Sequence, residues 1–235
     1  MEYADIPVDS KFSKDNEIYF SYIDKINSTN LSAQDLIYDF TSYVGSVNLA
    51  RFLTFFECFQ KVKGISGDIA DVGTYKAASL LAFAKLIQIF EPHSQTRVHG
   101  YDWWKGQKPG LEDNEENSEK YVAIESEVRK LIDMQGLDKI ALINSLDLVS
   151  HLGDYFETRP QLRFKLVFLD CGIKNVLESS MKFFWPRLAS GGILLLDHYN
   201  NFSSPSESSV IDSYIDTRKV YQFDYSRSPS AYIIK

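Results

Sequence analysis

The stretch that decides the fold is "GDIADVGTYKAAS", residues 67–79. "DIADV" has the pattern of a buried strand, Gly73 supplies a turn, and "AAS" begins a helix, as in the first half of a parallel βαβ unit. Dinucleotide-binding turns place three glycines here so that the backbone can approach a pyrophosphate, whereas this turn has Gly73 followed by Lys76, Ala77 and Ala78. The stretch therefore predicts room for a nucleoside and a small carboxylate, with less room for a pyrophosphate.

Strands and helices alternate after this turn. Apolar runs typical of strands are "DIADV", "RVHGY", "KIALIN", "KLVFLD" and "GGILLLD", and helical patterns separate most of them, including "AASLLAFAKLIQIF" and "EKYVAIESEVRKLIDMQG" (residues 119–136). This alternation predicts an α/β fold, a Rossmann-like and mostly parallel sheet covered on both faces. The last two runs, "KVYQFDY" and "SAYIIK", have no helix between them and predict an antiparallel hairpin at one edge, which makes seven strands.

The chain divides into an N-terminal segment and one main domain. Residues 1–46 are polar and rich in tyrosine, and "NLSAQDLIYDF" places a serine three positions before an aspartate at a predicted helix start. We expect this segment to be a helical cap. Residues 47–235 form the ligand-binding domain, beginning with the amphipathic helix "VNLARFLTFFECFQKV". The cap and the loop 105–118 are expected to close over a substrate.

Composition limits the classes of partner. The chain has 235 residues, 44% of them hydrophobic, with a net charge of −7 and a pI near 5.2. This balance argues against a nucleic-acid surface or a polybasic membrane patch, because both need clustered cations. Cys58 and Cys171, the two cysteines, lie too far apart in sequence to suggest a disulfide framework or a paired-cysteine zinc site. We expect a soluble, cytoplasmic protein with a small-molecule partner, and a homo-oligomer is left open.

The carboxyl ends of the predicted strands carry polar residues, and ligands of open parallel sheets bind at those ends. The residues are Asp71 and Gly73, Asp102, Asn144 and Ser145, Asp170, and Asp197 with His198. Asp102 ends the second strand, where a carboxylate can accept both ribose hydroxyls, and Trp103 beside it is expected to flank the adenosine. Asn144 and Ser145 are placed within reach of an adenine edge. Adenine and ribose without a phosphate indicate S-adenosylmethionine.

The methionine end of such a cofactor would meet the first turn. The helix that starts near Ala77 offers free backbone N–H groups and a positive dipole to a carboxylate. We expect Gly73, Tyr75 and Ser79 to lie around that carboxylate, with Asp71 at the end of the strand below.

Four segments resemble the macrocin O-methyltransferase family of class I S-adenosylmethionine-dependent methyltransferases. "GISGDIADVGTYKAASLLAFAKLI" is similar to its first motif, Gly-Ile-Pro-Gly-Asp, a strand, then Glu-x-Gly-x-x-x-Gly-Gly-Ser, and "HGYDWWKG" to its Gly-Phe-Asp-Ser-Phe-Glu-Gly segment. "EVRKLIDMQGLDKIALINS" resembles the helix and strand that follow, and "FLDCGIKNVLESSMKFFWPRLASGGILLLDHYN" resembles its Asp-Gly-Asp, Leu-x-Pro-Gly-Gly and Asp-Asp-Tyr block. The resemblance runs from about residue 47 to 200. It implies a class I methyltransferase fold, S-adenosylmethionine as cofactor, and a hydroxyl acceptor, largely a sugar of a natural product.

The resemblance also implies a magnesium ion, with Asp170, Asp197 and His198 in the ligand positions. Two departures stand out: Gly172 replaces the aspartate implied to be the general base, and His198 replaces an acidic ligand. An imidazole suits manganese better than magnesium, so the metal is Mg²⁺ or Mn²⁺ if one binds. Lys174 is similar in position, one residue late, to the base of the catechol-type O-methyltransferases. The catalytic candidates are His198, Asp170 and Lys174, and His198 could take the proton if no metal binds.

Two other functions are compatible with parts of this pattern. The departures at Gly172 and His198 could mean a methyltransferase-like protein that binds its nucleoside without catalysis. A nicotinamide-dependent oxidoreductase is disfavoured because the three-glycine turn is absent. The sequence favours an active O-methyltransferase acting on a hydroxyl of a small molecule.

Overall fold

The computed structural model describes residues 18, 21–26, 28–108, 110, 113, 121–201 and 204–235. Most of the expected closing loop 105–118, and residues 1–17 of the expected cap, lie outside the described residues.

The seven strands form one mixed sheet in the order β3-β2-β1-β4-β5-β7-β6. Neighbours among β1 to β5 are parallel, and β7 is antiparallel to both β5 and β6, so the predicted sheet and its C-terminal edge hairpin are confirmed. The strand order reverses direction between β1 and β4. Open α/β sheets bind ligands at such a switch point. The strands are β1 (Asp68–Val72), β2 (Val98–Asp102), β3 (Ala141–Ser145), β4 (Phe164–Leu169), β5 (Leu188–Leu196), β6 (Val220–Gln222) and β7 (Ala231–Ile234).

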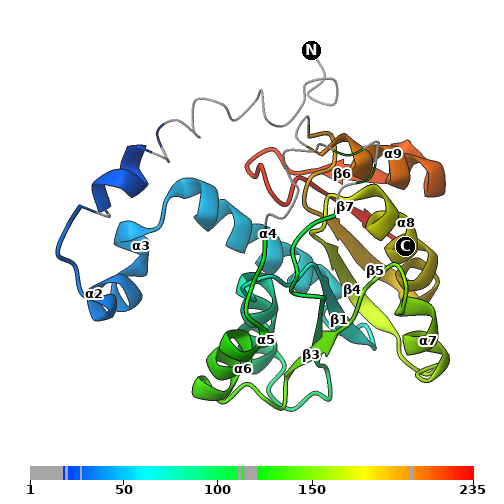
Figure 1. Cartoon of the computed structure of the whole chain (residues 1–235), viewed down its shortest axis with the longest axis horizontal. Coiled ribbons are helices and arrows are strands. Elements are labelled where there is room, and N and C mark those ends of the chain that lie inside the picture. The colour runs from blue at the N-terminus through cyan, green and yellow to red at the C-terminus, as the bar shows by residue number, and fades with distance from the viewer. Residues whose placement is uncertain are drawn as a thin grey trace.

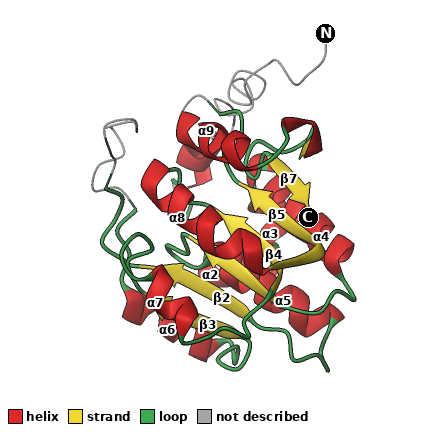
Figure 2. Cartoon of the chain, turned by 90° about the vertical axis from the view of Figure 1, so that its right-hand side faces the viewer, coloured by secondary structure: helices red, strands yellow, loops and turns green. Residues whose placement is uncertain are grey.

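Helices cover both faces of the sheet (Figures 1 and 2). One apolar core lies between the sheet and α4 (Ser46–Val62), α5 (Ala78–Phe90) and α6 (Glu125–Met134). A second core lies between the opposite face and α7 (Leu152–Glu157), α8 (Lys174–Phe184) and α9 (Pro205–Tyr214). Two short 3₁₀ helices are η3 (Trp185–Arg187) and η4 (Thr217–Lys219). Because every residue of β4 is buried, its apolar run is explained by this double coverage.

Helix α6 is shorter than the sequence indicates. The apolar pattern predicts a helix over residues 119–136, but α6 begins at Glu125. Tyr121 has a φ of +62°, and Val122 forms a β-bridge with Lys105. The left-handed Tyr121 and the bridge at Val122 therefore stand where the first turns of the expected helix would lie.

The N-terminal helices stand beside the main body (Figure 1). They are α2 (Ala33–Tyr38) and α3 (Phe40–Tyr43), and neither contains a buried residue. The predicted start of α2 is confirmed, because the side chains of Ser32 and Asp35 each accept a hydrogen bond from the other residue's backbone N–H. Among the described residues, no helix has the length and apolar character needed to cross a membrane.

Candidate active site

A cavity of about 650 Å³ opens at the carboxyl edge of the sheet. Its size and mixed polar and apolar wall are typical of small-molecule sites. Seven of the residues predicted for the site lie in its wall: Gly73, Tyr75, Asp102, Trp103, Asp170, Asp197 and His198. The strand-end prediction therefore placed most of its candidates around one cavity.

The turn after β1 requires glycine at position 73. Gly73 has a φ of +91°, and a Cβ built there would overlap the carbonyl oxygen of Asp170 and lie 2.8 Å from the carbonyl carbon. The single glycine of the turn thus permits close approach of the ends of β1 and β4. Tyr75 and Ala77 follow with φ values of +48° and +66°, a left-handed conformation that costs L-residues energy. Backbone strain of this kind concentrates at ligand sites.

Asp102 holds this turn against the end of β2. Its Oδ2 accepts a hydrogen bond from the Tyr75 backbone N–H at 2.8 Å, and its Oδ1 accepts one from the Trp104 backbone N–H at 2.7 Å. Burial raises the pKa of Asp102, and these N–H donors partly offset that effect. Each carboxylate oxygen keeps a further lone pair. Asp102 can therefore position the turn and still accept a ligand hydroxyl from the cavity.

Asn144 and Ser145 were expected within reach of an adenine edge, but neither side chain faces the cavity. The Asn144 amide donates to the Gly100 carbonyl and accepts from the Tyr155 hydroxyl, while the Ser145 hydroxyl accepts from the Trp104 indole. Neither residue belongs to the cavity wall. The wall on this side comes from the following segment, Leu146 to Ser150, which includes Asp147. The pattern of polar residues at strand ends stops at Ser145 and therefore does not indicate this segment.

Asp71 and Ser79 lie beneath the turn and outside the cavity wall. Asp71 is fully buried, and its burial raises the pKa to about 7, with a smaller opposing effect from the hydroxyls of Ser79 and Thr74. Their expected contact with a cofactor carboxylate would therefore be indirect, through the backbone of the turn above them.

The buried carboxyl group of Asp71 should make stability depend on pH. Between about pH 4 and 7 the unfolded chain ionises this group before the folded protein does, so the folded state binds more protons and loses stability as pH rises. A shift from 3.8 to about 7 corresponds to roughly 4 kcal/mol above pH 7. Asp71→Asn is therefore expected to gain stability relative to wild type as pH rises from 4 to 8, measured by urea unfolding. The exposed Asp138→Asn is the control, and an equal pH dependence in both variants would contradict the assignment.

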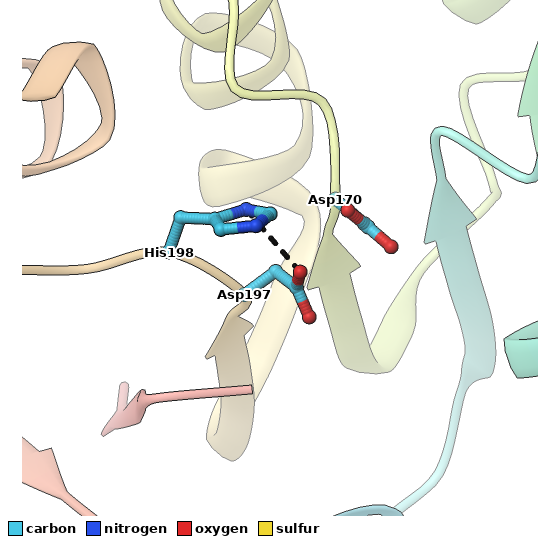
Figure 3. Close-up of side chains that lie close together, drawn as sticks. All are labelled: Asp170, Asp197 and His198. Carbon is cyan, nitrogen blue, oxygen red and sulfur yellow. Dashed lines mark ion pairs between the residues drawn. The ribbon is translucent and has the colours of Figure 1, made fainter. Parts of the chain in front are cut away.

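Asp170, Asp197 and His198 meet at the ends of β4 and β5 (Figure 3). One ligand-type atom from each lies within 4.8 Å of the others, which confirms the predicted convergence. The His198 Nδ1 is 3.2 Å from Asp197 Oδ2. Lys174 is not part of this cluster's cavity wall. It begins α8, where its backbone N–H donates to Asp113.

An arginine that no sequence motif indicated joins this cluster. From α4, the Arg51 Nη1 donates to Asp197 Oδ1 at 2.5 Å and the Nη2 donates to Asp170 Oδ2 at 2.8 Å. Burial raises the pKa of Asp170 to about 6, helped by the charge of Asp197 and opposed by Arg51. For Asp197, the charges of Arg51 and His198 outweigh burial and lower the pKa. Asp197 is therefore the firmly ionised member of the pair.

Glu207 fixes the loop that carries His198. It is fully buried in α9, and its Oε1 accepts a hydrogen bond from the His198 backbone N–H at 3.0 Å. Burial raises the pKa of Glu207 well above its ordinary value, and the nearby Asp197 charge adds to this. No sequence motif pointed to Glu207, because a lone glutamate in a polar helix start is ordinarily solvated.

Comparisons with known proteins agree with this architecture. The sequence matches no protein-family model, and no curated protein shows detectable similarity to it. Among solved structures, the calicheamicin methyltransferase CalS11 superposes with a TM-score of 0.81 at 14% identity, covering 93% of this chain and 91% of CalS11. An apo structure of CalS11, named as a TDP-rhamnose 3′-O-methyltransferase, gives 0.76 at 15% identity, covering 93% of each chain. The O-methyltransferase NovP gives 0.65 at 17% identity, covering 80% of each chain. The chain therefore has the Rossmann-like class I methyltransferase fold that these enzymes share.

Proposed function

We propose that this protein is an S-adenosylmethionine-dependent O-methyltransferase that acts on a hydroxyl of a small molecule, with a sugar as the first candidate. The observation that carries the proposal is the single cavity bounded by Asp102 at one strand end and by the Asp197–His198 pair at another. Such a cavity can hold a nucleoside and an acceptor hydroxyl side by side. The likeness of the fold to CalS11 and NovP supports the same reading.

The wall residues suit the proposed cofactor. Both Asp102 and Asp147 lie in the cavity wall; Asp102 would accept the ribose hydroxyls, and Asp147 would accept from an adenine amino group. The turn from Gly73 to Tyr75 would face the methionine carboxylate. When bound, S-adenosylmethionine would supply a methyl group carried on a positively charged sulfur. The charged residues of the wall are Asp102, Asp147, Asp170, Asp197, Lys108 and Arg227, and Arg51 pairs with Asp170 and Asp197 from outside the wall.

His198 is the proposed general base. The His198 Nδ1 lies 3.2 Å from Asp197 Oδ2, and the negative charge of that carboxylate would favour the tautomer with the hydrogen on Nδ1. This leaves Nε2 as the nitrogen able to take a proton from an acceptor hydroxyl. A carboxylate that fixes the tautomer of a histidine is a common device for making such a base. Asp170 and Lys174, the other candidates, are less suited, because Arg51 pairs with the first and the second lies outside the cavity wall.

Residues 1–46, including the exposed helices α2 and α3, are proposed as a cap over the cavity of the domain 47–235. The acidic composition favours a soluble, cytoplasmic enzyme over one that acts on nucleic acid or at a membrane surface.

A methyl-transfer assay tests the function. The protein would be incubated with S-adenosylmethionine labelled in its methyl group and with a panel of free sugars, glycosides and TDP-sugars. Transfer of label to a hydroxyl of at least one sugar class is expected. Cofactor binding without transfer to any polyol would favour the alternative, a methyltransferase-like binding protein without catalysis, for which the loss of an acidic residue at Gly172 is the supporting observation.

Asp102→Ala is expected to weaken S-adenosylmethionine binding at least about tenfold. It removes one or two hydrogen bonds to an ionised acceptor, each about 1.5–3 kcal/mol, and releases the Tyr75 backbone N–H. Calorimetric titration measures the change, with the exposed Asp133→Ala on α6 as the matched control. If Asp102→Ala binds the cofactor as well as this control does, Asp102 is not a cofactor ligand.

A further inference from the structure

The acidic pair of the site already has a cation. The resemblance implies a divalent metal held by Asp170, Asp197 and His198, but the Arg51 guanidinium lies between the two carboxylates, 2.8 Å from one and 2.5 Å from the other. Its Nη1 and Nη2 each donate to a different carboxylate, so the planar guanidinium bridges the pair.

The donor atoms around Asp197 leave little capacity for a metal. Its Oδ1 accepts from Arg51, while its Oδ2 accepts from the Ser228 hydroxyl at 2.7 Å and faces the His198 Nδ1. A divalent ion bound to Asp170 and Asp197 would lie beside the positive charge of the Arg51 guanidinium, and this like-charge contact opposes its binding. The residues present therefore do not fit a metal bound jointly by these three side chains.

Arg51 packs against two buried aromatic rings of the fold. Its guanidinium carbon lies 5.2 Å from the ring centre of Phe55 and 5.4 Å from that of Phe168, and both rings are buried. Its Nη1 also donates to the Ser228 hydroxyl at 2.8 Å. Cation–π contacts on two rings and three hydrogen-bonding partners hold the group in one place. A metal that entered the site would have to displace the Arg51 guanidinium and break these contacts.

We propose that Arg51 is the permanent cation of this site, in place of a divalent metal, and that it positions Asp197 and thereby His198. Arg51 lies outside the cavity wall, whereas Asp170, Asp197 and His198 lie in it. It therefore acts through the carboxylates as a positioning residue. The inference rests on these contacts alone, so it stands or falls separately from the proposed methyl transfer.

Metal binding by the unaltered protein is the first test. Mn²⁺ would be titrated into the full chain, with the free ion followed by electron paramagnetic resonance. We expect no saturable site with a Kd tighter than about 1 mM. A site of micromolar affinity that is lost in Asp170→Asn would overturn the proposal, whatever is found for methyl transfer.

Arg51→Met provides the second test. Methionine keeps an unbranched side chain between Phe55 and Phe168 but removes the charge, so the two carboxylates lose their cation. Mn²⁺ affinity is expected to rise about tenfold or more, since uncompensated carboxylates are hard-metal ligands. The gain should vanish in Arg51→Met/Asp170→Asn, an outcome that a merely structural role for Arg51 would not produce. Arg129→Met, which removes an exposed arginine of α6, is the control.

Circular dichroism establishes whether Arg51→Met folds. If it folds and binds Mn²⁺ no better than wild type, Arg51 does not replace a metal. If it does not fold, Arg51→Gln serves instead, because glutamine also removes the charge but keeps an amide that can donate to a carboxylate. Folded Arg51→Gln is then expected to bind Mn²⁺ more tightly than wild type, and equal weak binding would overturn the proposal.

Discussion

Replacing His198 by alanine is expected to lower kcat for methyl transfer about 10²- to 10⁴-fold, the usual contribution of a general base. The affinity for S-adenosylmethionine should change little, because Asp102 and the turn at Gly73 lie at other strand ends of the cavity. Rates would be measured with a sugar acceptor identified in the transfer assay, and cofactor affinity by calorimetry. A selective loss of kcat is the result that a base predicts.

His151→Ala is the matched control for this variant. His151 is an exposed histidine before α7 with no side-chain capping contact, so its removal should leave kcat unchanged. Glu207→Gln should perturb the His198 loop less than His198→Ala does, because the glutamine amide oxygen can still accept from the His198 backbone N–H. An unchanged rate in His198→Ala would show that another group takes the proton.

Gly73→Ala is expected to destabilise the fold by at least about 3 kcal/mol, in the upper range for single substitutions. A methyl group there would overlap the carbonyl oxygen of Asp170, and the backbone φ of +91° is unfavourable for any L-residue. Because the β1 and β4 ends would be pushed apart, cofactor binding should fall as well. Urea unfolding measures the first effect and calorimetry the second.

Gly64→Ala separates the two causes. Gly64 has a φ of +87°, but a Cβ built there meets nothing within 4 Å. This control should lose only the cost of the left-handed backbone, about 1–2 kcal/mol. Equal losses in the two variants would mean that the contact between Gly73 and Asp170 contributes nothing.

The sheet, and the edge at which the carboxyl ends of its parallel strands lie together, could be predicted from the sequence. Short apolar strands between helices can bury both faces only in a parallel, doubly covered sheet, which is what the structure shows. Asp170 and Asp197 could be placed together because both follow strands that end at one edge. The capping serine of α2 was also readable, since its partner lies three residues away.

Features that depend on the direction of a side chain, or on contacts between residues far apart in the chain, could not be predicted from the sequence. Arg51 lies 119 and 146 residues before its two carboxylate partners, and on an amphipathic helix an arginine reads as part of the solvent face. Asn144 and Ser145 were at the right strand end, but their side chains are used by Tyr155 and Trp104. The shortened start of α6 depended on a bridge to Lys105, which no local pattern encodes.

Calorimetric titration of the wild-type protein with S-adenosylmethionine and with NAD tests the central claim most directly. The cavity presents Asp102 for a ribose, while the turn at Gly73 continues into Tyr75 and Ala77 and has no further glycines to admit a pyrophosphate. We predict saturable binding of one S-adenosylmethionine per chain, with NAD at least about tenfold weaker. Tighter binding of NAD than of S-adenosylmethionine would contradict the account.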